Sequence, residues 1–214
     1  MVLALPKGRI LKALRPVLAR TGLNLPEDCI SESSRHLRFK TSDPGLDIVR
    51  VRSFDVATFV AYGGAALGVC GSDVLSEFDY PDICAPLDLG IGGCRLAVAR
   101  LESRDPEELA SLSRLRVATK YPATARRFYA ARSINAEILH LHGAMELAPV
   151  LNMADVIVDL VDTGATLRAN GLVEMEDIAP ISSRLVVNRV AMKTHPEAVR
   201  DLINRFREAL QGGL

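Results

Sequence analysis

Residues 155–172 constrain the fold of this chain most strongly. An apolar run over residues 156–161 has the length and composition of a buried strand, and only Asp159 interrupts it. The polar segment 162–166 breaks the run, and a short helical pattern then continues to Gly171. A strand, a tight polar turn and a helix start present backbone N–H groups and hydroxyls to a phosphate. A carboxylate inside such a strand is costly unless it is paired or faces a ligand.

The composition is that of a water-soluble globular protein. The chain has 214 residues, 49% of them hydrophobic and 24% charged, which suits one large domain or two small lobes. No apolar run reaches the roughly 20 residues of a membrane helix. The apolar residues 1–5 are too few for a signal peptide, and Lys7 and Arg9 follow them directly. We therefore expect a cytoplasmic protein with no membrane association, in which the four cysteines are small buried thiols.

Charge is balanced overall but not locally. The net charge is zero, which argues against non-specific nucleic-acid binding. Residues 1–52, however, hold ten Lys/Arg against five acids, one of them Glu32. Such an excess is typical of a solvated face, and it also suits a small polyanionic ligand.

Strand and helix patterns alternate along the chain and predict an α/β fold with mostly parallel sheets. The predicted strands are residues 2–5, 48–52, 65–70, 95–101, 116–119, 137–141, 156–161 and 181–187. Helical patterns lie between most of them, including one over 143–151, and an amphipathic helix follows residues 194–197. The glycines of 90–93 predict a hinge, with a return near 178–184. We expect two lobes, 1–89 plus 180–214 and 90–179, with a ligand cleft between them.

These features suit a ligand that carries a monophosphate, two vicinal hydroxyls and a diphosphate. The turn 162–166 offers backbone donors and the hydroxyls of Thr163 and Thr166 to the monophosphate. Asp159 is placed to accept hydrogen bonds from sugar hydroxyls, and the arginines of the first lobe suit the diphosphate. Such a site needs no nucleophilic side chain, because positioning and stabilisation of leaving-group charge drive the reaction. Phosphoribosyl diphosphate has these groups.

The chain resembles the ATP phosphoribosyltransferases, the first enzymes of histidine biosynthesis. Residues that match the family signature within 146–167 are Glu146, Ala154, Ile157, Asp159, Leu160, Thr163, Gly164, Thr166 and Leu167. Further resemblance lies in residues 5–9, 47–52, 68–75 and 182–185, so it covers nearly the whole chain. Three residues depart from the family pattern: Asn152 replaces a usual glycine, and Ala66 and Ser72 replace a usual acid and base.

The resemblance implies transfer of the phosphoribosyl group to N1 of ATP with release of pyrophosphate, with Mg²⁺ bound mainly through substrate phosphates. It also implies a two-lobed fold like that of type II periplasmic binding proteins. Asp159 is then expected to bind ribose hydroxyls and Asp162, Thr163, Gly164, Ala165 and Thr166 the 5′-phosphate, with Glu146 and Leu167 also in the substrate site. Arg9 and Arg35 are the expected catalytic residues, and Lys7, Gly8 and Arg52 the further substrate-binding residues.

The length implies the short form of the family. A longer form carries a C-terminal histidine-binding domain, whereas this chain stops one predicted helix after the return to the first lobe. The resemblance then implies a hetero-oligomer with a regulatory subunit related to histidyl-tRNA synthetase, which confers inhibition by histidine. A homodimer is the expected minimal unit.

Two other functions remain open from the residues alone. Salvage-type phosphoribosyltransferases, which act on free bases, share an apolar strand followed by acids and Thr-Gly-x-Thr. They usually have two adjacent acids where this chain has Val158-Asp159, which counts against them. A non-enzymatic two-lobed ligand-binding domain is the second alternative.

Overall fold

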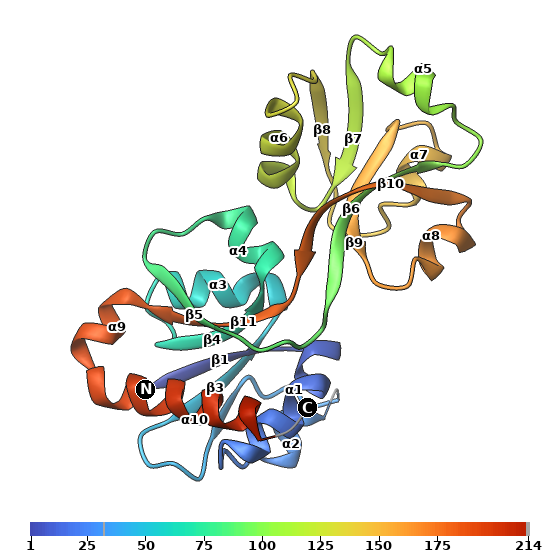
Figure 1. Cartoon of the computed structure of the whole chain (residues 1–214). Helices are drawn as coiled ribbons and strands as arrows, with labels where there is room; N and C mark the ends of the chain where they lie inside the picture. Colours follow the sequence, from blue (N-terminus) through green and yellow to red (C-terminus); the bar gives the residue numbers. More distant parts are fainter. Residues whose placement is uncertain (32, 213–214) are drawn as a thin grey trace. The chain divides into compact units, whose positions relative to one another are not determined.

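The computed structural model describes residues 1–31 and 33–212, so Glu32 and the last two residues lie outside the described residues. The chain divides into two compact units (Figure 1). Unit 1 comprises Met1–Gly92 and Ser182–Leu214, and unit 2 comprises Gly93–Ile181. Within the described ranges, no helix is both long and apolar enough to span a bilayer.

Unit 1 is built on a six-stranded sheet in the order β2-β3-β1-β4-β11-β5. Its strands are β1 (Val2–Pro6), β2 (Arg38–Lys40), β3 (Asp47–Val51), β4 (Leu67–Gly71), β5 (Ile83–Asp88) and β11 (Ser183–Asn188). The three strands β3, β1 and β4 are parallel, and their carboxyl ends therefore meet at one edge of the sheet. The remaining pairs are antiparallel.

Helices cover both faces of this sheet. They are α1 (Arg9–Arg20), α2 (Glu27–Ile30), α3 (Ser53–Ala61), α4 (Ser72–Phe78), α9 (Arg189–Thr194) and α10 (Pro196–Gln211). Alternate residues of β1 point to opposite faces, as the pleat of a strand requires. Leu3 and Leu5 pack with α1 and α10, whereas Ala4 packs with α3 and α4. Gly68 lets α3 approach β4, because a Cβ there would lie 2.7 Å from the side chain of Val56.

Unit 2 has a five-stranded sheet in the order β10-β6-β9-β7-β8. Its strands are β6 (Cys94–Leu101), β7 (Leu115–Thr119), β8 (Ala136–His140), β9 (Val156–Val161) and β10 (Leu172–Ile181). Its helices are α5 (Pro106–Ala110), α6 (Pro122–Ala130), α7 (Leu147–Val150) and α8 (Ala165–Ala169). Strands β9, β7 and β8 are parallel, and β6 and β10 pair antiparallel to their neighbours.

The α/β class is confirmed, but the prediction of mostly parallel sheets is wrong. Five of the nine strand pairs are antiparallel. The chain passes from β5 to β6 and from β10 to β11 with no intervening helix. These strands lie in different sheets, so the short links do not pair them with each other. Within unit 1, β2 and β3 are joined by a short link and pair antiparallel, because a parallel pair needs a long crossover connection.

Other differences concern edge and capping elements. Strands β2, β5 and β10 and helix α9 were not among the elements that the sequence pattern predicted, and the helix predicted over 143–151 spans only Leu147–Val150. Strand β10 carries three acids, Glu174, Glu176 and Asp177, and lies at an edge of its sheet, where polar side chains remain solvated. With these acids in the strand, apolar and polar residues do not alternate regularly, so the sequence pattern does not indicate a strand.

An ion pair fixes the start of β9 against β7. The carboxylate of Asp155 is nearly buried and accepts from Arg116 Nη2 at 2.8 Å, from Arg116 Nε at 3.2 Å and from the Arg116 backbone N at 2.9 Å. Burial alone raises the pKa of Asp155, but hydrogen bonds and charge from Arg116 outweigh it and hold the pKa below its ordinary value of 3.8. The ionised form therefore stabilises the folded state.

We expect Asp155→Asn to lower the free energy of unfolding by about 2 kcal/mol at pH 7, because Arg116 loses its anionic partner. The contribution of a carboxylate with a lowered pKa is fully present above its ordinary pKa and is lost as the pH falls through the lowered one. Urea unfolding at pH 7 and near pH 2 should therefore show a difference between wild type and variant that shrinks on acidification. Glu137→Gln, which removes the exposed partner of Arg114, should change stability by less than about 0.5 kcal/mol. A difference that persists at the low pH would contradict this account.

Candidate active site

The polar turn of unit 2 has the conformation that a phosphate-binding turn needs. Strand β9 ends at Val161, and α8 begins at Ala165 with Gly164 as its N-terminal flanking residue. Gly164 has φ +72°, and a Cβ there would lie 2.9 Å from Arg168 Nη1 and 3.1 Å from Glu174 Oε1. The backbone angle therefore favours glycine at this position, and any side chain there would also displace the ends of Arg168 and Glu174. Thr163 and Thr166 are exposed on either side of it.

Arg95 of β6 supports this turn from the neighbouring strand. Its guanidinium donates to the backbone oxygen of Asp162 at 3.0 Å and to the carboxylate of Glu174 at 2.6 and 2.8 Å. The hydrogen bonds to Glu174 raise the pKa of Arg95 further. The sequence analysis missed this support, because Arg95 and Glu174 are far from the turn along the chain and carry no motif.

Asp159 lies at the carboxyl edge of the unit 2 sheet. It is half-buried near the end of β9, and one of its carboxylate oxygens accepts from the backbone N of Leu160 at 2.8 Å. The parallel register pairs Val158 with Thr119, the last residue of β7, so Lys120 follows β7 beside Asp159. Lys120 was not among the predicted site residues. Its signal is a polar residue directly after a buried strand, the same signal that Asp162 gives.

Two other predicted residues of unit 2 take different positions. Leu167 is buried in the hydrophobic cluster that also contains Met145 and Ala148, so its side chain serves packing and only its backbone can serve a ligand. Glu146 is half-buried and directly precedes α7. Helix α7 packs on β6 and β9, whereas α8 packs on β10.

In unit 1, three predicted residues meet at the carboxyl edge of the sheet. The register pairs Pro6 with Val51, and the backbone N of Lys7 donates to Val51 O at 2.9 Å. Lys7 and Arg52 therefore leave the ends of β1 and β3 side by side, and both are exposed. Gly8 has φ +79° and ψ −140°, a conformation open essentially to glycine alone, and it turns the chain into α1.

The predicted catalytic arginines lie at this same edge. Arg9 is the exposed first residue of α1. Arg35 is exposed in the loop before β2, and the backbone N of Arg50 donates to Leu37 O at 2.8 Å. Continuing the antiparallel β2–β3 register places Arg35 opposite Arg52. A cavity of about 330 Å³ opens here, and Lys7, Gly8, Lys12, Ser34 and Arg50 are among its lining residues. Sequence reasoning did not assign Lys12 or Arg50 a role.

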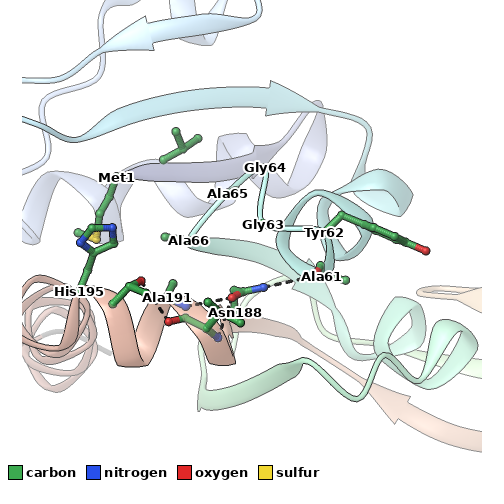
Figure 2. Close-up of a pocket in the computed structure, with 13 residues that line it drawn as sticks. Met1, Ala61, Tyr62, Gly63, Gly64, Ala65, Ala66, Asn188, Ala191 and His195 are labelled. Carbon is green, nitrogen blue, oxygen red and sulfur yellow. Dashed lines mark hydrogen bonds between the residues drawn. The ribbon is translucent and has the colours of Figure 1, made fainter.

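A second cavity of unit 1, of about 500 Å³, contains none of the predicted residues (Figure 2). Met1, residues 61–66 and His195 line it at the amino edge of β1 and β4, opposite the edge described above. Its buried polar residue, Asn188, is already engaged: its amide N donates to Val60 O at 2.7 Å, and its Oδ1 accepts from the backbone N of Val190 and Ala191. These bonds cap α9 and give the side chain a structural role.

Comparison with known proteins identifies the family. The family model described as HisG, ATP phosphoribosyltransferase, matches residues 52–208. The chain belongs to the ATP phosphoribosyltransferase family. It is 70% identical over 210 residues to the ATP phosphoribosyltransferase of Gluconobacter oxydans, covering 98% of this chain and 87% of that protein. It is 57% identical to that of Rhodospirillum rubrum, covering 98% and 92%.

Solved structures agree with this assignment. A chain of the ATP phosphoribosyl transferase (HisG:HisZ) complex from Thermotoga maritima superposes with a TM-score of 0.83 at 31% identity, and each chain is covered completely. The periplasmic aliphatic sulphonate binding protein SsuA from Escherichia coli superposes with a TM-score of 0.59 at 14% identity, over 98% of this chain and 72% of that one. That second likeness shows the fold alone. The predicted family, enzyme class and periplasmic-binding-protein-like fold are confirmed, and the two rival functions are not favoured.

The departures from the family pattern have structural explanations in two of three cases. Asn152 has φ +55°, a left-handed conformation that asparagine tolerates better than most residues, and its side chain accepts from Arg116 Nη2 at 3.1 Å. Ser72 Oγ accepts from the backbone N of Ser182 at 3.2 Å, where the chain re-enters unit 1. Nothing in the structure explains Ala66.

Proposed function

We propose that this chain transfers the phosphoribosyl group of phosphoribosyl diphosphate to N1 of ATP and releases pyrophosphate, the first step of L-histidine biosynthesis. Membership of the ATP phosphoribosyltransferase family supports the reaction. The observation that carries the site is the turn at Gly164, where strand, left-handed glycine and helix start present backbone donors and two exposed threonines.

Unit 2 is proposed to hold the ribose 5-phosphate part of the substrate. Residues 162–166 bind the 5′-phosphate through backbone N–H groups and the hydroxyls of Thr163 and Thr166. Asp159 accepts hydrogen bonds from the ribose hydroxyls, since its carboxylate lies at the carboxyl edge of β9, just before the turn. Glu146 and the backbone of Leu167 complete this part of the site.

Unit 1 is proposed to stabilise the leaving pyrophosphate and the triphosphate of ATP. Lys7, the backbone of Gly8 and Arg52 bind phosphate oxygens, and Arg9 and Arg35 act on the charge that develops as the C1–O bond breaks. Guanidinium groups suit this role because they bind phosphate with two parallel hydrogen bonds. N1 of adenine is largely unprotonated at neutral pH, so its lone pair can attack without a general base.

Mg²⁺ fits this site as a partner of the substrate phosphates. Among the described residues, no three His, Cys, Asp or Glu side chains are grouped to hold a metal ion. Asp159 and Asp162 supply the oxygen ligands that Mg²⁺ prefers, and Mg²⁺ commonly uses one or two carboxylates together with phosphates and water. When bound, the ion neutralises phosphate charge, and the residues of the turn keep their positioning role.

The direct test is an assay of the purified chain with ATP, phosphoribosyl diphosphate and Mg²⁺, with detection of pyrophosphate and of the N1-phosphoribosyl product. Pyrophosphate release that requires ATP supports the proposal. Turnover with a free purine or pyrimidine but not with ATP would instead establish the salvage-type reaction. Binding of both ligands without turnover, with and without a regulatory subunit, would leave a ligand-binding domain.

Asp159→Asn is expected to weaken phosphoribosyl diphosphate binding by about tenfold and to change ATP binding by less than about twofold. The amide keeps the size of the carboxylate but loses the charge that strengthens its hydrogen bonds to ribose hydroxyls. Calorimetric titration with each ligand separately measures both effects, and Glu137→Gln, at the opposite end of the unit 2 sheet, is the control. Equal weakening of both ligands would remove the proposed ribose contact.

The proposal extends to assembly. The structural relative from Thermotoga maritima is a HisG:HisZ complex, which supports a hetero-oligomer of this chain with a regulatory subunit related to histidyl-tRNA synthetase. A homodimer is its proposed minimal unit. Assays with and without such a subunit, each with added histidine, test this: inhibition by histidine should require the subunit. The proposed cytoplasmic location is supported by the four cysteines, none of which forms a disulfide.

A further inference from the structure

We propose that Arg50 is a positioning residue that fixes the backbone on both sides of Arg35 and thereby holds the Arg35 guanidinium in its catalytic position. This inference rests on the role proposed above for Arg35. Arg50 lies on β3, one strand pairing away from the loop that carries Arg35. It lies within residues 47–52, one of the segments that resemble the family, but it was not predicted as a site residue.

The guanidinium of Arg50 donates hydrogen bonds to four backbone oxygens in the segment around Arg35. Nη1 donates to Cys29 O at 2.9 Å and to Ser31 O at 2.6 Å. Nη2 donates to Ser34 O at 2.8 Å and to His36 O at 3.4 Å. Two of these acceptors, Ser34 O and His36 O, belong to the residues on either side of Arg35. The other two lie at the end of α2, so the same guanidinium also holds that helix end.

Because the Arg50 side chain is buried, its hydrogen bonds to the loop are shielded from competition by water. Arg50 is only 4% exposed, and its Nε finds no hydrogen-bond partner within the part of the chain that the structure describes. A buried guanidinium is costly unless its donors are engaged, and the four acceptors named above are neutral carbonyl oxygens. Packing of the guanidinium near the Phe39 ring, at 5.6 Å from its centroid, leaves little freedom to swing. The loop is therefore tied to the sheet by a rigid, planar group.

Apart from the backbone bond from Arg50 N to Leu37 O, the side-chain contacts of the loop described next are exposed and correspondingly weaker. Asp28 Oδ2 pairs with His36 Nδ1 at 2.8 Å, and the His36 backbone N donates to Ser34 Oγ at 3.2 Å. The His36 side chain is 81% exposed, so water competes for these bonds. Arg50 is thus the main buried support for the loop.

The shape of the side chain matters as well as its charge. Arginine presents its donors in a planar fork that can reach several carbonyls at once, whereas lysine has a single ammonium at the end of a flexible stem. Arg50→Lys keeps the charge and loses the fork. Arg50→Met keeps much of the apolar volume but loses both the charge and the planar fork of donors. The two variants separate positioning from charge and from simple filling of space.

The test compares wild type, Arg50→Lys, Arg50→Met, Arg35→Ala and the double variant Arg50→Met/Arg35→Ala in steady-state assays. We expect Arg50→Met to lower kcat by about tenfold to thirtyfold with KM values within about threefold, and Arg50→Lys to recover part of the loss. In the Arg35→Ala background, Arg50→Met should lower kcat no further, because the group that it positions is gone. Losses that multiply, or an unchanged kcat in Arg50→Met, would overturn the proposal.

A control variant and a second measurement distinguish positioning of Arg35 from a general effect of losing a guanidinium. Arg205→Met removes another guanidinium of unit 1 that binds a backbone oxygen, Thr21 O at 2.8 Å, and it should leave kcat unchanged. Hydrogen exchange read by mass spectrometry over residues 29–37 should be faster in both Arg50 variants and unchanged in Arg205→Met. This readout does not depend on turnover, so it still decides the positioning role if the proposed reaction fails. If Arg50→Met does not fold, Arg50→Lys decides the question by both measurements, and unchanged exchange would overturn the proposal.

Discussion

Replacing Arg35 by alanine is expected to lower kcat by about 10²- to 10³-fold while each KM changes by less than about threefold. The reason is that pyrophosphate gains charge only as the C1–O bond breaks, so the guanidinium stabilises the transition state more than the bound substrates. The location of Arg35 opposite Arg52, at the edge where Lys7 and Gly8 lie, supports this role. Steady-state kinetics in both substrates measure it.

Arg38→Ala is the matched control for Arg35→Ala. Arg38 is another exposed arginine close by, but it pairs with Asp47 on the neighbouring strand. Its loss should change kcat by less than about twofold. If Arg35→Ala instead raises KM with kcat unchanged, Arg35 contributes only ground-state binding and the catalytic role is wrong.

Gly164→Ala is expected to lower kcat/KM for phosphoribosyl diphosphate by about 10²-fold. A Cβ at this position meets Arg168 Nη1 at 2.9 Å and Glu174 Oε1 at 3.1 Å, and φ +72° disfavours any side chain. The ends of both side chains must then move, which disturbs the surroundings of the donors proposed for the 5′-phosphate. Displacement of Glu174 also disturbs Arg95, which holds the backbone oxygen of Asp162.

Gly171 offers a control with nearly the same backbone strain. Its φ is +71°, and a Cβ there meets no atom within 4 Å. Gly171→Ala should therefore lower the free energy of unfolding by about 1 kcal/mol, much as Gly164→Ala does, but leave kcat/KM near the wild-type value. Thermal unfolding and the kinetic assay together separate the two effects. Equal activity losses in both variants would mean that strain alone, rather than the phosphate turn, explains the result.

The local features of the site were predictable because they depend on residues close together in the chain. Strand β9, the break at residue 162 and the start of α8 follow from a period of apolar residues ended by a glycine-containing turn. The Lys7-Gly8-Arg9 turn follows from the same reasoning, since β1 and α1 flank it directly. The roles assigned to these residues stay predictions until the variants are measured.

The supporting residues were not predictable because their partners are distant in sequence. Arg95 contacts Glu174, 79 residues away, and Arg50 contacts Cys29, 21 residues away. Lys120 comes beside Asp159 only through the β7–β9 register. No spacing rule links such pairs, since their contact depends on which strands become neighbours.

The sequence by itself determined the family, the α/β class and the strand–turn–helix conformation of residues 156–169, because these reside in short motifs whose backbone conformation is set locally. Tertiary structure alone decided the mixed strand directions and the packing of Leu167 into the core. It also decided which arginines, the buried Arg50 and the partly exposed Arg95, contact the segments of the two predicted anion-binding edges. The physical reason is that strand order and burial are properties of the assembled sheet, where each side chain's neighbours come from segments far apart in the chain.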